Sequence, residues 1–143
     1  MGHSLGDYQK IIDDAVRKNG NIHYQPSVSR DLIVSYSSGA DVGIFAVENI
    51  PLSYRFSLPN KFFEWAHAGL PVLVSENFEY MAELLEESEF GWSCPFEDVG
   101  ETVRRISDAD LSRYSENARR FAAEAVWEED AKAFADVYRA KGA

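Results

Sequence analysis

The chemistry-bearing residues of this chain concentrate at the start of one expected helix. Residues 57–70 read SLPNKFFEWAHAGL, and an apolar run, PVLVS, follows at 71–75. At helical spacing, four polar residues share one face: Asn60, Lys61, Glu64 and His67. The opposite face is apolar and consists of Phe62, Phe63, Ala66 and Leu70. A helix that only packs needs just its apolar stripe, so the polar face indicates a second role.

The first turn of this helix is suited to a phosphate group. Ser57 is expected to be the N-cap, and Pro59 is tolerated in a first turn because an N–H there has no helical partner. The free N–H groups at that end attract anions, and Lys61 adds a positive charge. The carboxylate of Glu64 could accept hydrogen bonds from both hydroxyls of a ribose. Phosphate and diol together describe a nucleoside diphosphate; the alternative is an amphipathic helix with a Lys61–Glu64 surface pair.

The surrounding pattern alternates between helices and strands. Strands are expected at 21–25, 41–47, 71–75 and 90–94. Helices are expected at 7–18, from Ser27 or Ser29 to about 36, through the opening stretch, at 77–88, at 99–107, and twice within 110–141. This order predicts an α/β fold, a Rossmann-like doubly wound parallel sheet of about four strands. Because the chain opens on a helix, we expect the sheet to be truncated on its N-terminal side. Ligands of such sheets bind beyond the carboxyl ends of the strands.

Composition restricts the function classes. The chain has 143 residues, which fits a single domain over 1–143, and hydrophobic residues make up 45% of it. A net charge of −10 disfavours nucleic acid and anionic membrane surfaces as partners. Cys94 is the single cysteine, so no disulfide framework or metal-ligand spacing is present, and a buried structural thiol is expected there. The N-terminus, MGHSLGDYQK, lacks the apolar core of a signal peptide, and no apolar run is long enough to span a membrane, so we expect a cytoplasmic protein.

Three segments resemble the C-terminal, donor-binding domain of retaining GT-B glycosyltransferases. The first, SLPNKFFEWAHAGLPVLVS, is similar to the family's Pro-Asn-Lys, Glu and Gly-x-Pro pattern. The second, FGWSCPFEDVGETVRRI, is similar to its Gly-containing strand, acidic loop and helix. The third is the C-terminal helical region with Trp127, Glu128 and Tyr138. The resemblance implies that this chain binds the nucleotide-sugar donor, UDP- or GDP-linked, for transfer of the sugar to an acceptor hydroxyl without a metal or other cofactor.

The resemblance also implies roles for single residues. Glu64 matches the second glutamate of the family's Glu-x7-Glu motif, which holds the donor ribose. The segment Ser57, Leu58, Pro59, Asn60 and Lys61 would lie near the donor sugar and the diphosphate. The first glutamate of the motif would fall at position 56, where this chain has phenylalanine. The contact that usually selects the donor sugar is therefore not implied here.

Other parts of the family's machinery lie upstream of the matched segments. These are the phosphate-clamping basic residues and the N-terminal acceptor domain, so we expect this chain to be a fragment that is inactive as a transferase in isolation. The alternative function is a non-catalytic Rossmann-like module that binds a partner protein. Glu76 and Glu79, which follow the strand at 71–75, could contact a sugar hydroxyl or favour the N-terminus of the next helix.

Overall fold

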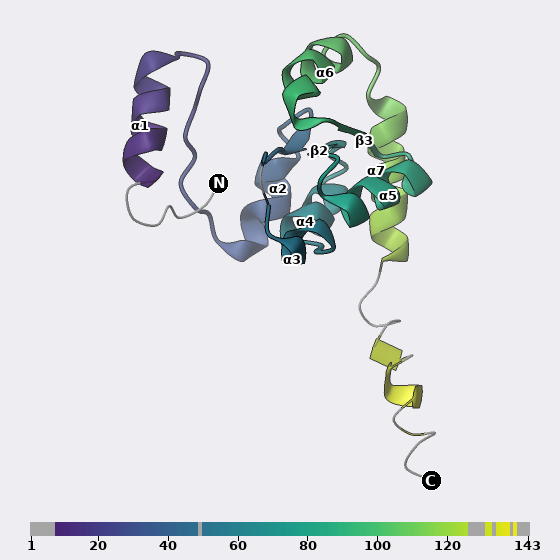
Figure 1. Cartoon of the computed structure of the whole chain (residues 1–143). Coiled ribbons are helices and arrows are strands. Elements are labelled where there is room, and N and C mark those ends of the chain that lie inside the picture. The colour runs from purple at the N-terminus through teal and green to yellow at the C-terminus, as the bar shows by residue number, and fades with distance from the viewer. Residues whose placement is uncertain (1–7, 49, 126–130, 133, 138, 140–143) are drawn as a thin grey trace. The chain divides into compact units, whose positions relative to one another are not determined.

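A computed structural model describes residues 8–48, 50–125, 131–132, 134–137 and 139 (Figure 1). The chain forms two compact units, one up to Ile33 and one from Val34 onward. The expected features at Trp127, Glu128 and Tyr138 lie outside the described residues.

The described residues of the first unit form an α-helix, α1 (Tyr8–Lys18), and a short 3-10 helix, η1 (Arg30–Leu32). α1 ends at Lys18, directly before Asn19 and Gly20, where the sequence predicts the helix to end. Arg17 and Lys18 lie in its last turn, where positive charge is favourable. The strand expected at 21–25 is wrong: these residues are exposed and form no strand. A strand is stable only when a neighbour completes its backbone hydrogen bonds, and the described residues provide none for this segment.

The second unit alternates strands and helices. Its elements are α2 (Ile33–Ser37, which begins at the boundary), β1 (Gly43–Phe45), α3 (Leu52–Arg55), α4 (Asn60–His67), β2 (Val72–Ser75), α5 (Glu79–Ser88), β3 (Gly91–Cys94), η2 (Phe96–Asp98), α6 (Val99–Ile106) and α7 (Ser112–Glu124). Helical backbone recurs at 131–132 and 134–137. The single turn of α3 lies between the strand expected at 41–47 and the helix expected within 57–70, where the sequence predicts no helix.

The described strands form one parallel sheet in the order β1-β2-β3. Gly43 lies beside Val72 and Phe45 beside Val74, and β2 continues to pair with β3 as far as Ser75 and Cys94. All four residues of β2 are buried, which explains why its sequence is a continuous apolar run. The α/β class with parallel strands is therefore confirmed, with three described strands in place of about four.

The core lies between the sheet and the helices α4, α5 and α7, whose ribbons lie next to the sheet in Figure 1. Phe62 is completely buried, and its ring lies 5.2 Å from that of Phe90 and 5.8 Å from that of Phe121. Ala66 and Met81 are also completely buried in this cluster. The apolar face of α4 is thus turned into the core, as its spacing predicts. No described helix is long and apolar enough to cross a bilayer.

Candidate functional site

A cavity of about 520 Å³ opens at the carboxyl end of β1. Most of its wall is apolar, and the polar side chains lie where it meets the start of α4. The lining residues are Phe45, Val47, Ile50, Pro51, Tyr54, Ser57, Pro59, Asn60, Lys61 and Phe78. The cavity therefore lies at a strand end of a parallel sheet, where ligands of such folds bind.

Aromatic packing fixes the inner wall of this cavity. The ring of Phe45, the last residue of β1, lies 4.6 Å from Trp65 on α4 and 6.1 Å from Phe78. Gly43 allows this arrangement, since a Cβ atom there would lie 2.4 Å from the Trp65 ring. The strand end, α4 and the start of α5 are therefore held together on the side of the cavity that faces the core.

The N-terminus of α4 forms the polar edge. Pro59 is the N-cap and its carbonyl accepts the N–H of Phe62 at 2.9 Å, while no side chain caps this end. The N–H groups of Asn60 and Lys61 belong to the first turn, where a helix offers no carbonyl partner. The prediction that Ser57 is the N-cap is wrong. The Ser57 hydroxyl donates instead to the carbonyl of Tyr54 at 3.2 Å, because the turn of α3 ends immediately before it.

Lys61 is exposed at this edge and forms no ion pair with a carboxylate among the described residues. The surface pair with Glu64, the alternative considered for this helix, is therefore not formed there. The Lys61 charge and the orphan N–H groups of the first turn both favour an anion at the cavity edge.

The structure brings together four of the six residues that the sequence predicts for the site. Ser57, Pro59, Asn60 and Lys61 line the cavity, whereas Leu58 packs against the core. Glu64 is partly buried on α4, three residues beyond Lys61, and is not among the lining residues. Its role in holding a ribose stays a prediction.

Sequence reasoning missed the apolar part of the lining. Phe45, Val47, Ile50, Tyr54 and Phe78 are unremarkable in sequence, because apolar residues beside strands fill cores as often as they line cavities. Only the position of Phe45 and Val47 at the end of a buried strand could have indicated them.

The other strand ends have structural roles. Cys94 is a buried free thiol, as expected, and its carbonyl accepts the N–H of Glu76 at 2.9 Å. Glu79 lies in the first turn of α5 and accepts a hydrogen bond from Arg55 Nε at 3.0 Å. No group of three potential metal ligands occurs among the residues that the structure describes.

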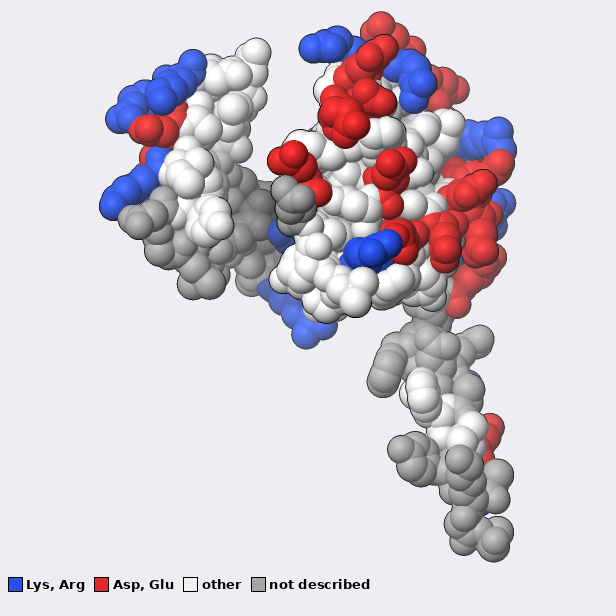
Figure 2. Space-filling model, viewed as in Figure 1, with Lys and Arg blue, Asp and Glu red and all other residues white. Residues whose placement is uncertain are grey.

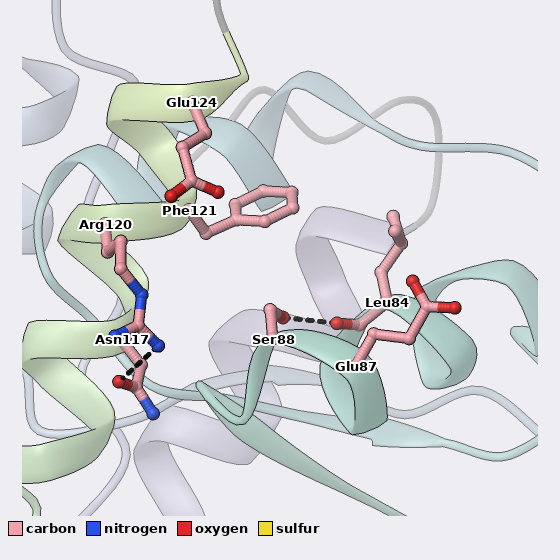
Figure 3. A pocket seen from close by; sticks show the side chains of 7 residues that line it. All are labelled: Leu84, Glu87, Ser88, Asn117, Arg120, Phe121 and Glu124. Atoms are coloured by element: carbon pink, nitrogen blue, oxygen red, sulfur yellow. Dashed lines mark hydrogen bonds between the residues drawn. The ribbon is translucent and has the colours of Figure 1, made fainter.

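A second cavity, of about 270 Å³, lies between α5 and α7 (Figure 3). Three of its polar side chains, those of Ser88, Asn117 and Arg120, form hydrogen bonds within the fold. Asn117, which is 7% exposed, donates to the carbonyl of Glu89 at 2.9 Å and accepts from Arg120 at 2.9 Å. Glu89 ends α5 in a left-handed conformation. Because Asn117 lies on α7 and binds the Glu89 carbonyl, it connects this end of α5 to α7. This cavity is therefore a junction between helices and a weaker candidate site.

The surface charge of the second unit is unevenly distributed. Figure 2 shows many acidic side chains over the part that contains α5, η2 and α6, with fewer basic ones among them. Exposed members of this group include Glu83, Glu86, Glu97, Asp98 and Glu101. An anionic ligand is repelled there, so the edge formed by Lys61 is the more favourable place for it.

The arrangement suits a ligand with both a flat apolar part and an anionic part. Apolar and aromatic walls hold the former, and the first turn of α4 with Lys61 attracts the latter. Comparisons of the chain with protein-family models, with curated proteins and with solved structures gave no match.

Proposed function

We propose that this chain is the donor-binding half of a glycosyltransferase and holds a nucleotide sugar in the cavity beyond β1. One observation carries the proposal: an apolar cavity at the end of a parallel strand meets a helix N-terminus that no side chain caps. Lys61, which forms no ion pair within the described part of the chain, lies at the same edge. A nucleoside diphosphate has the matching parts, since its base is a flat ring and its phosphates are anionic.

The proposal assigns each part of the donor to a part of the site. The base contacts the aromatic and aliphatic wall, which includes Phe45, Tyr54 and Phe78. The diphosphate accepts hydrogen bonds from the first turn of α4 and from Lys61. The ribose hydroxyls donate to Glu64, farther along the same helix.

The proposed reaction needs no metal in this half. The developing negative charge on the departing nucleoside diphosphate is stabilised by the helix N-terminus and Lys61. The glycosyl group passes to a hydroxyl of an acceptor held by a second, N-terminal domain, and the resemblance implies retention of configuration. The complete fold is then a doubly wound, Rossmann-like sheet with further strands before β1, in a cytoplasmic enzyme. The chain by itself is expected to bind the donor and not to transfer the sugar.

Isothermal titration of the chain with UDP and GDP tests the proposal. One of the two nucleotides should bind, and Lys61→Ala should weaken it roughly fivefold, because an exposed charge contributes about 1 kcal/mol. Lys18→Ala is the matched control, since Lys18 is an exposed lysine on α1, and it should leave binding unchanged. Absence of binding by both nucleotides at millimolar concentration would rule out the donor site.

A second titration tests the role of Glu64. The wild-type chain should prefer the ribonucleotide over its 2′-deoxy analogue by roughly tenfold, because the analogue cannot donate its second hydroxyl to the carboxylate. Glu64→Gln should reduce this preference while affecting the deoxy analogue much less. A preference that is equal in both proteins would show that Glu64 does not hold the ribose.

A protein-interaction module is the second candidate function, because three exposed apolar side chains occur in and directly after α3. Leu52 is 67% exposed, Tyr54 55% and Phe56 61%. Several exposed apolar side chains in one short segment are a feature of interaction surfaces. The nucleotide titrations distinguish the two candidates, since a module of this kind binds neither UDP nor GDP.

A further inference from the structure

Two side chains, one from the last residue of β2 and one from the turn before α5, bind the chain that leaves β1. Asn77 Nδ2 donates to the carbonyls of Val47 at 2.7 Å and of Glu48 at 3.0 Å. Asn77 Oδ1 lies 2.7 Å from the Ser75 hydroxyl, which donates to it. The same hydroxyl lies 3.3 Å from the N–H of Val47, which donates to it. Both backbone groups of Val47 are therefore held by side chains.

This arrangement fixes the orientation of the Asn77 amide. Its nitrogen faces two carbonyls and its oxygen faces a hydroxyl, so each atom has a suitable partner. Ser75 is completely buried, so its hydroxyl depends on these partners. Aspartate at position 77 would place an acceptor against both carbonyls, and alanine at position 75 would remove the partner of Asn77 Oδ1 and of the Val47 N–H.

The contacts begin where the sheet ends. The backbone register of β1 with β2 ends at Phe45 and Val74. Beyond that point the chain must leave the sheet to form the wall of the cavity, to which Val47 and Ile50 contribute. Asn77 and Ser75 hold this segment through side-chain hydrogen bonds in place of strand pairing. The segment can therefore turn away from β2 while its position stays defined.

We propose that Asn77 is a positioning residue: it fixes the wall of the cavity that follows β1 and thereby sets the affinity of the ligand site. Asn77 itself is not among the lining residues, so it acts through Val47 and Glu48. The effect on affinity rests on the proposed nucleotide site, whereas the effect on the wall does not.

Amide hydrogen exchange on the full chain tests the positioning role. In Asn77→Asp the Val47 amide should exchange roughly 30-fold faster, because two hydrogen bonds that hold this segment are lost. Asn77→Ala removes the same two donors without adding a charge, and it serves as the second variant should Asn77→Asp fold poorly. The amides of Val72 and Leu73 in β2 should keep their wild-type rates. The control is Asn19→Asp, which makes the same change at an exposed site on the other unit and preserves the Oδ1 that accepts the Asn21 N–H at 3.0 Å.

The results separate three outcomes. A change confined to the wall, with roughly tenfold weaker binding of UDP or GDP, supports the proposal in full. An unchanged exchange rate at Val47 overturns the proposal. An equal acceleration at Val47 and throughout β2 also overturns it, because that result shows only a loss of global stability. If wild-type protein binds neither nucleotide, the proposed function fails, and the exchange rates still decide whether Asn77 positions the wall.

Discussion

Replacement of Phe62 by alanine tests how α4 is held in place. Phe62 is completely buried in the first turns of the helix, and its ring packs against Phe63, Phe90 and Phe121. Truncation removes the transfer free energy of the ring and leaves a cavity among rigid neighbours, which together cost about 3–5 kcal/mol. A domain of this size is stable by about 5–15 kcal/mol, so the variant should lose a large part of its free energy of unfolding.

Urea denaturation followed by tryptophan fluorescence measures this loss. The midpoint for Phe62→Ala should fall by more than about 1 M, given slopes of about 1–3 kcal/mol per molar urea. Phe56→Ala is the matched control, because Phe56 is 61% exposed and its removal should change stability by less than about 0.5 kcal/mol. Phe62→Leu should fall between the two. Equal midpoints for the two alanine variants would refute the inward orientation of the apolar face of α4, and with it the outward position of Asn60 and Lys61.

Two further predictions concern single positions. Gly91→Ala should lower the free energy of unfolding, measured in urea, by more than about 2 kcal/mol, because its Cβ would lie 2.0 Å from the Val72 carbonyl oxygen. Gly100→Ala has no atom within 4 Å of its Cβ and should be neutral or stabilising by up to about 1 kcal/mol. The opposite ranking would contradict the packing of β3 on β2. Hydrogen bonds from the Ser112 side chain, the larger cause, and from the Ser112 backbone N–H lower the pKa of Asp110. The stabilisation from this carboxylate is therefore present above its ordinary pKa of about 4 and is lost as the pH falls through the lower pKa of the folded state. Asp110→Ala should therefore melt below wild type at about pH 7, and the difference should shrink at about pH 3; a constant difference would argue against ionisation as its source.

The helices and buried strands were predictable where one pattern dominated. The apolar spacing of Phe62 and Ala66 predicted both α4 and its buried face, and the run at 71–75 predicted β2. The segment 21–25 was mistaken for a strand because strand formation depends on a partner that local sequence does not reveal. Ser57 was mistaken for the N-cap because a preceding turn, α3, provides another acceptor for its hydroxyl.

The candidate site was predictable only in its polar part. Asn60 and Lys61 follow from the expected start of α4 at a strand end. Tyr54 and Phe78 reach the cavity because α3 and the start of α5 fold back toward the same strand end. The bonds of Asn77 to Val47 and Glu48 join residues 30 and 29 positions apart, a pairing that local sequence patterns do not encode.

Binding of a nucleoside diphosphate at the start of α4 is tested by following backbone amides by NMR during titration with UDP and with GDP. Such binding should produce saturable shifts at Asn60, Lys61 and Val47 with one of the two nucleotides, while amides around the cavity between α5 and α7, such as Asn117, should not shift. Unchanged Asn60 and Lys61 amides at saturating nucleotide, or shifts confined to the region of Asn117, would contradict it.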